Sequence, residues 1–261
     1  MPSIQPDASP PSPAWDDVEL HNPHISSEKA GKVRTMFAAI AGSYDLNNRV
    51  HSLGRDQAWR RYAVKAAAVK PGDTVLDVAC GTGDLTQAFA VSPAAKVVGL
   101  DFTPAMLDHA RSKQQRLDRA VADKITYIEG DAQKLPFADA TFDCLSIAFG
   151  IRNVASPRLA VKEFHRVLRP GGRLVILEFD RPSFAPLRWF NDVYCGWIMP
   201  RTATLISGDR SGAYKYLPAS VGTFMSRKAL CELIGQAGFE QVASRGLSLG
   251  ICVCYRAVTR A

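Results

Sequence analysis

The sequence predicts an α/β protein with a mostly parallel sheet and helices on both of its faces. From residue 74 onward, near-continuous apolar segments that read as strands alternate with amphipathic helical segments. Strands of this kind are buried on both sides, as in a doubly wound sheet. The 261 residues are 47% hydrophobic and 22% charged, which is enough apolar material for one large core.

Helices are expected before the first strand. Residues 1–25 contain six prolines and little periodicity, which predicts a disordered leader. From Ser27, apolar residues at spacings of three and four predict a helix, one face of which holds Val33, Met36, Phe37, Ile40 and Ala41. The next segment is helical in parts, breaks at Gly54 and ends at the turn Pro71-Gly72.

Strands and helices then alternate. The predicted strands of this part are 74–79, 96–101, 125–131, 142–150 and 173–179. Helices are expected from about Leu85, over 104–117 and over 157–168, with the turn Pro170-Gly171-Gly172 after the last of them. A helix over 226–239 and strands over 241–250 and 251–259 complete the domain.

The segment 181–223 is rich in aromatic residues and poorly periodic, and we expect it to form an inserted helical cap. The sequence therefore predicts a single domain over 26–261 that carries this cap.

The net charge of +7 is spread unevenly. Residues 1–30 hold five acids and one lysine, a balance of −4, so the remaining chain carries +11. A basic body favours an anionic partner or surface. Because no dense Lys/Arg run and no basic–aromatic pattern occurs, no nucleic acid is expected.

Composition also bears on location and metals. No run of about 18 apolar residues occurs, and neither a secretory signal nor a transit peptide is recognisable. The six cysteines form no CxxC pair and no Cys/His ligand spacing, which predicts reduced thiols and no metal site. A cytoplasmic protein is expected, and peripheral contact with the inner face of a membrane is left open.

A glycine turn, "VACGTGDL", follows the first strand at the place where doubly wound sheets bind ligands. A dinucleotide fingerprint needs a third glycine where Thr86 stands, which counts against an NAD(P)-dependent oxidoreductase. A phosphate loop needs a Lys-Ser/Thr pair after Gly83, but Asp84-Leu85 follows. An acid directly after the turn is expected to repel an anion and to suit a cationic ligand.

Further acids end the neighbouring strands. Asp77 precedes Gly81 by four residues, and Asp101 ends the second strand, where a carboxylate can accept both hydroxyls of a ribose. Asp131 ends the third strand and could accept an adenine amino group. These positions indicate a ligand with a ribose, an adenine and a positive charge but no phosphate, and S-adenosylmethionine fits all four points.

A family resemblance rests on longer motifs. The set "VLDVACGTGD", "GDAQKLPF", "AFGIRNV", "RVLRPGGRLVILEF" and "SGDRSGAYKYLPASV" resembles class I S-adenosylmethionine-dependent methyltransferases. More narrowly, residues 33–258 are similar to the menaquinone/ubiquinone biosynthesis C-methyltransferase family. This resemblance implies a Rossmann-like doubly wound sheet with N-terminal helices and an inserted helical substrate cap.

The resemblance implies cofactor contacts at Thr82, Asp101, Asp131, Ala132 and Ala148, which join Asp77, Gly81 and Gly83 as expected cofactor-binding residues. The family often has Ser or Thr where Ala148 stands, so only a backbone contact is expected there. Cys80 replaces a residue that is usually glycine.

Arg152 and Asn153, at the end of the fourth strand, are the expected catalytic residues. Methylation of a ring carbon needs a quinol that has lost a hydroxyl proton, because the phenolate places charge on the adjacent carbon. Arg152 is always cationic, so it could lower the pKa of the quinol or polarise a water, but it cannot be a simple base. The alternative is that Arg152 only pairs with a structural carboxylate.

Tyr44, Asp209 and Tyr216 are the expected substrate-binding residues. Tyr44 and Asp45 are expected to close over the cofactor or simply to cap a helix, and Tyr216 to line the substrate entrance or to pack. The cap segment 187–206, with Trp189 and Trp197, is expected to form an apolar channel, to rest on a membrane surface or to be an ordinary buried cap.

The expected reaction is transfer of a methyl group from S-adenosylmethionine to a demethylated prenylquinol. Demethylmenaquinol comes first, and a 2-polyprenyl-6-methoxybenzoquinol second. Rival interpretations are a methyltransferase of another lipophilic molecule, such as a sterol or a polyketide, and a non-catalytic cofactor- or quinone-binding partner. A homodimer or a biosynthetic complex is left open.

Overall fold

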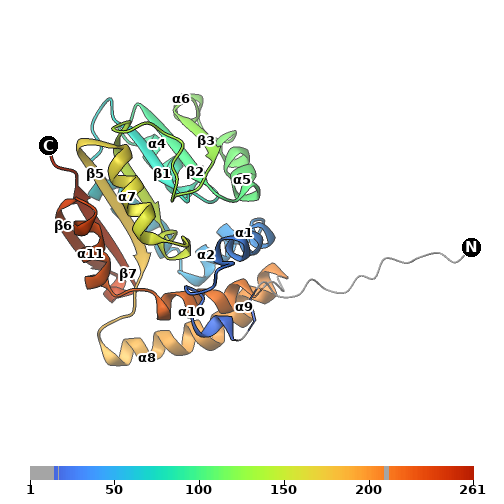
Figure 1. The fold of residues 1–261 in the computed structure, drawn as a ribbon. Helices are drawn as coiled ribbons and strands as arrows, with labels where there is room; N and C mark the ends of the chain where they lie inside the picture. Colours follow the sequence, from blue (N-terminus) through green and yellow to red (C-terminus); the bar gives the residue numbers. More distant parts are fainter. Residues whose placement is uncertain (1–14, 17, 209–211) are drawn as a thin grey trace, which may run out of the picture.

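The structure, a computed structural model, describes residues 15, 16, 18–208 and 212–261 (Figure 1). All seven predicted strands form. They are β1 Thr74–Val78, β2 Lys96–Asp101, β3 Ile125–Glu129, β4 Phe142–Ala148, β5 Leu168–Phe179, β6 Glu240–Leu247 and β7 Cys252–Val258.

The helices are α1 Lys29–Ile40, α2 Tyr44–His51, α3 Arg55–Ala67, α4 Asp84–Val91, α5 Pro104–Gln114, α6 Arg119–Ala122, α7 Pro157–Val167, α8 Ala185–Val193, α9 Met199–Ser207, α10 Ala213–Thr223 and α11 Arg227–Gln236. Shorter helical turns are η1 Glu19–His21, η2 Ile151–Asn153, the π-helical turn η3 Tyr194–Ile198 and η4 Ser248–Gly250.

The strands form one sheet in the order β3-β2-β1-β4-β5-β7-β6. The pairs among β1 to β5 are parallel, whereas β7 runs antiparallel to both β5 and β6. The chain order reverses between β1 and β4, so the switch point of a doubly wound sheet lies at the carboxyl ends of these two strands. This arrangement confirms the predicted α/β fold.

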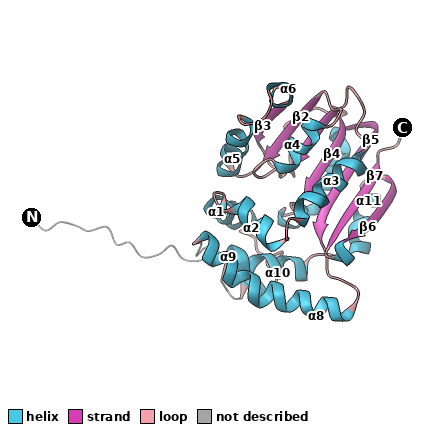
Figure 2. Ribbon diagram, turned by 180° about the vertical axis from the view of Figure 1, so that it is seen from behind, coloured by secondary structure: helices cyan, strands magenta, loops and turns pink. Residues whose placement is uncertain are grey.

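Side chains alternate between the two faces of the sheet, and each face has its own core. One core lies under α7 and α11 and includes Leu76, Phe164 and Ile234. The other lies under α3, α4 and α5 and includes Phe89 and Leu107. Figure 2 shows the strands between these two helical layers. The predicted burial of the strands on both sides is correct for β1, β2, β4 and most of β5, but the edge strand β6 is largely exposed.

A third core joins the N-terminal helices to the cap. Met36 on α1, Met106 on α5, Ala203 on α9 and Tyr216 on α10 are buried together. In Figures 1 and 2, α1, α2, α9 and α10 gather at one end of the sheet. The predicted helical cap is thus present, and it packs on segments about 170 residues earlier in the chain.

Two predictions of local structure differ from the structure. The expected turn Pro170-Gly171-Gly172 lies inside β5, where the pairing with β4 shifts register and Gly171 has a φ of +71°. Most of the leader 1–25 lies outside the described residues, but its described end is packed rather than disordered. Trp15 is buried there and stacks on Tyr216 with ring centroids 4.8 Å apart.

The six cysteines, all within the described ranges, are free thiols. No helix of the described chain is long and apolar enough to cross a bilayer.

Candidate active site

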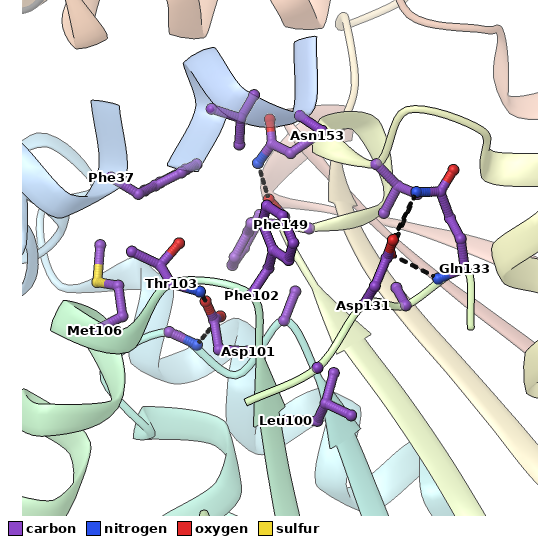
Figure 3. A pocket seen from close by; sticks show the side chains of 18 of the residues that line it. Phe37, Leu100, Asp101, Phe102, Thr103, Met106, Asp131, Gln133, Phe149 and Asn153 are labelled. Atoms are coloured by element: carbon purple, nitrogen blue, oxygen red, sulfur yellow. Dashed lines mark hydrogen bonds between the residues drawn. The ribbon is translucent and has the colours of Figure 1, made fainter. Parts of the chain in front are cut away.

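A cavity opens at the carboxyl ends of β1, β2 and β4 and is covered by α1 (Figure 3). It encloses about 780 Å³ of empty space when the part open to solvent is counted. Seven of the predicted site residues line it, namely Tyr44, Gly81, Asp101, Asp131, Ala132, Ala148 and Asn153. The remaining wall is mostly apolar and includes Phe37 and Met106.

The two strand-end acids face this cavity from neighbouring segments. The Asp101 carboxylate accepts hydrogen bonds from the main-chain N–H groups of Gly81 and Thr103, both at 2.8 Å. Asp131 accepts one from the main-chain N–H of Gln133 at 2.9 Å. Each carboxylate has further lone pairs, so both acids fit the hydroxyls of a ribose and the amino group of an adenine. Burial raises the pKa of Asp101.

The glycines of the turn have different tasks. Gly81 has a φ of +55° and lines the cavity, so ligand and backbone can approach closely there. Gly83 has a φ of +82° and does not line the cavity. A Cβ at Gly83 would lie 2.2 Å from the Tyr127 hydroxyl, so this glycine is required by packing.

Asp77 lies deeper than the other acids. It is 1% exposed and accepts hydrogen bonds from the hydroxyls of Thr86 at 2.7 Å and Ser146 at 2.6 Å. Burial raises its pKa to about 6, against these hydrogen bonds. Asp77 lines a smaller recess next to Gly81, together with Arg60, which the sequence analysis did not select.

The glycine turn is tied to α2. The Thr82 hydroxyl donates to Asp45 at 2.5 Å, and Lys113 donates to the same carboxylate at 2.7 Å. Lys113 also pairs with Asp84, and Arg49 pairs with Asp84 at 3.1 Å. Burial opposes ionisation of Asp84, but these cations outweigh it and hold its pKa at about 2. Asp84 is therefore ionised, but its charge is already paired with Lys113 and Arg49.

The expected catalytic pair lies on η2, directly after β4. Arg152 is buried and does not line the cavity. Its guanidinium donates to Glu178 at 2.5 Å, to the carbonyl oxygen of Phe149 at 2.9 Å and to the Ser220 hydroxyl at 3.3 Å. The structural pairing considered as the alternative is thus present, with Glu178 as the partner.

Asn153 does line the cavity. Its amide donates to the carbonyl oxygen of Phe149 at 3.1 Å, and its side-chain oxygen accepts from the Tyr216 hydroxyl at 3.0 Å. Tyr216 is 1% exposed and does not line the cavity, so it contacts the site through Asn153. Tyr44 faces the cavity, whereas Asp209 lies outside the described residues.

Three large aromatic side chains of α8 and η3 are exposed to solvent, in contrast to the buried Tyr214 and Tyr216 of α10. Trp189, Phe190 and Trp197 are 60% to 69% exposed, and α8 has no buried residue. The interpretation as an ordinary buried cap is therefore wrong for α8 and η3, whereas Met199 and Ala203 of α9 are buried.

The family model of the ubiE/COQ5 methyltransferase family matches residues 25–259, nearly the whole chain. The chain belongs to the ubiE/COQ5 methyltransferase family. Its methyl donor is S-adenosylmethionine, as the acids of the cavity indicated. Two proteins named ubiquinone/menaquinone biosynthesis C-methyltransferase UbiE are similar to it over 234 residues, 89% of this chain and 90% of theirs. They come from Pseudomonas paraeruginosa, at 38% identity, and Ectopseudomonas mendocina, at 40%.

Solved structures agree on the fold. A methyltransferase of Haloferax volcanii, in complex with the Trm112 activator, superposes with a TM-score of 0.63 at 19% identity, covering 86% of this chain and 98% of that one. An S-adenosylmethionine-dependent methyltransferase of Thermotoga maritima has a TM-score of 0.61 at 20% identity, covering 87% of this chain and all of the other. These likenesses confirm the class I methyltransferase fold.

Proposed function

We propose that this enzyme methylates a ring carbon of a demethylated prenylquinol, with demethylmenaquinol as the first substrate and 2-polyprenyl-6-methoxybenzoquinol as the second. The observation that carries this proposal is the similarity to quinone C-methyltransferases over 89% of the chain. The mostly apolar wall opposite Asp101 and Asp131 supports it, since it suits an aromatic ring beside the cofactor.

Asp101, Asp131 and Ala132 would hold the adenosine part of the cofactor, with Gly81 and Ala148 at its edge. Asp77 and Thr82 would face its other end, near the recess lined by Arg60. When bound, S-adenosylmethionine supplies an electrophilic methyl group. The chain's own task is to hold the quinol ring in line and to favour its deprotonated form.

Asn153 is proposed to contact the quinol oxygen directly. Tyr216 and the Phe149 carbonyl fix the orientation of its amide, which leaves one N–H of the amide free to donate. Arg152 is proposed to act from behind this contact, by holding η2 in place through its hydrogen bonds to Glu178 and to the carbonyl oxygen of Phe149. Tyr44, at the cavity wall, would close the site on the cofactor side.

The catalytic assignment can be tested with Arg152→Ala and the control Arg158→Ala, which removes an exposed arginine of α7. Arg152→Ala should abolish quinol methylation and leave cofactor affinity within about twofold. It leaves Glu178 buried without its cation, which costs about 3–5 kcal/mol, so the melting temperature and cofactor titration must accompany the assay. Full activity of Arg152→Ala would contradict the assignment.

We also propose that the outer face of the cap rests on the membrane that holds the prenyl tail. Trp189 and Phe190 are exposed on one turn and Trp197 about two turns later, and Arg188 and Arg201 flank the three aromatic residues. Exposed aromatic residues with flanking arginines are typical of helices that lie in the plane of a membrane surface.

The chain has four tryptophans, of which Trp15 and Trp59 are buried, so Trp189 and Trp197 report on this face. Brominated lipids in phosphatidylglycerol vesicles should quench their fluorescence, and the double change Trp189→Ser/Trp197→Ser should abolish vesicle binding. The control Leu249→Ser removes an equally exposed apolar side chain elsewhere. If the protein dimerises but does not bind vesicles, the exposed aromatic face is instead the contact surface for a second copy of the chain.

A further inference from the structure

Lys29, the first residue of α1, is 2% exposed and lies behind the catalytic turn. Its ammonium donates to the main-chain carbonyl oxygens of Arg152 at 2.8 Å and Val154 at 2.7 Å. Those two residues flank Asn153, and Val154 and Asn153 both line the cavity. Lys29 therefore fixes the backbone on both sides of the residue proposed to contact the quinol.

The third donor of Lys29 is directed to His24, whose Nδ1 lies 3.1 Å from the ammonium nitrogen. The other ring nitrogen, Nε2, donates to the carbonyl oxygen of Ser220 at 2.8 Å, so Nδ1 is free to accept. Burial lowers the pKa of His24, as do the charges of Lys29 and Arg152, so the ring is neutral. All three donors of the ammonium thus have partners, and each partner is uncharged.

The charges around the turn do not cancel. Arg152 forms an ion pair with Glu178, so the charges of these two side chains compensate each other. Lys29 forms no ion pair within the described ranges of the chain. Two tyrosines, Tyr44 and Tyr216, also face this region. Burial raises the pKa of both, to about 12 for Tyr216, so both are neutral. The buried cluster of Lys29, Arg152 and Glu178 therefore carries a net charge of +1, and that excess charge is on Lys29.

We propose that Lys29 is a positioning residue whose uncompensated positive charge stabilises the quinol anion, while its hydrogen bonds hold Arg152 and Asn153 in place. This inference rests on the proposed function. The quinol proton leaves to water, and Lys29 keeps its own proton and is not consumed. Arg152 alone cannot stabilise the quinol anion in this way, because at the distance of the quinol the carboxylate of Glu178 cancels the charge of Arg152. Burial and the neighbouring Arg152 lower the pKa of Lys29 to about 8, so the group is charged at neutral pH.

The size of the effect follows from Coulomb's law. For an assumed separation on the order of 10 Å between the ammonium and the quinol oxygen, a unit charge lowers the pKa of that oxygen by about 1 unit at an effective dielectric constant of about 20. Loss of the charge should therefore move the pH dependence of kcat to higher pH by about 1 unit, and reduce kcat at pH 7 about tenfold.

The test compares the wild type with Lys29→Met and Lys29→Gln, and with the control Lys32→Gln. Lys32 lies on the same helix, and its ammonium pairs with Glu19 and with no carbonyl oxygen of η2 in the described chain. kcat is measured between pH 6 and 9 with reduced demethylmenaquinol. Both Lys29 variants should lose activity at pH 7 and regain most of it near pH 9, with unchanged cofactor affinity, whereas Lys32→Gln should follow the wild-type profile.

A uniform loss of kcat at every pH, with no shift of the profile, would overturn the proposal, because a merely structural role predicts that result. If Lys29→Met does not fold, Lys29→Gln still tests the proposal, because its uncharged amide can donate to the carbonyl oxygen of Arg152 or Val154. A wild type that methylates no quinol would overturn the proposed function itself, which is a different result from an unshifted profile in an active enzyme.

Discussion

Asp77→Asn should change the stability of the protein and its cofactor binding in opposite directions. Because burial raises the pKa of Asp77 from 3.8 to about 6, the fold favours the protonated carboxyl. The free energy of unfolding therefore falls as the pH rises from 3.8 to 6, by about 1.36 kcal/mol per unit, or about 3 kcal/mol in all. Asparagine cannot ionise, so the variant escapes this loss.

The amide of the introduced asparagine would fit the place of the carboxyl if one hydroxyl, of Thr86 or Ser146, turned to accept. The difference in the free energy of unfolding between Asp77→Asn and the wild type can be measured by urea unfolding. It should be about 2–3 kcal/mol more in favour of the variant at pH 8 than at pH 4. Calorimetric titration at pH 8 should show S-adenosylmethionine binding about tenfold more weakly, because a negative charge beside the cationic ligand is lost.

Asp108→Asn, on the exposed side of α5, controls for the change in net charge. The reasoning would be refuted if the stability difference between Asp77→Asn and the wild type were the same at both pH values.

Three further predictions concern the turn and its neighbours. Gly83→Ala should lower the free energy of unfolding by about 2–4 kcal/mol in urea unfolding, because the new Cβ would clash with the Tyr127 hydroxyl and the backbone is left-handed. The control Gly171→Ala has a left-handed backbone but open space around it, so it should destabilise the protein less. Tyr216→Phe removes the hydrogen bond to Asn153 and should lower kcat about tenfold without changing cofactor affinity, and unchanged kcat would contradict the role given to Asn153. Thr82→Val breaks the link to α2 and should speed cofactor release several-fold in stopped-flow measurements; an unchanged rate would show that α2 does not retain the cofactor.

The sequence was sufficient to predict the sheet and the acids that line the cavity, for a physical reason. Buried parallel strands are continuous apolar runs, and a ligand at their carboxyl ends must be met by the residue that ends each run, such as Asp101. Both signals are local in the chain. The β5 irregularity at Gly171 was not predicted, because a bulge and a turn have the same glycine signature.

The polar contacts were less predictable, because they join distant segments. The neutralisation of Asp84 by Lys113 and Arg49 depends on side chains 29 and 35 residues away. Lys29 and His24 were not selected, since a lysine at a helix start reads as solvent-exposed and His24 falls in the proline-containing leader. The hydrogen bonds of His24 to Ser220 on α10 and of Lys29 to the carbonyl oxygen of Arg152 make that segment part of the site.

The central claim is most directly tested by incubating the protein with methyl-labelled S-adenosylmethionine and chemically reduced demethylmenaquinol, with the benzoquinol precursor in parallel. We predict label on the ring carbon of the naphthoquinol, and label in both quinols would indicate an enzyme that serves two pathways. Label in neither quinol, with the cofactor bound, would contradict the proposed substrate while leaving the methyltransferase fold intact.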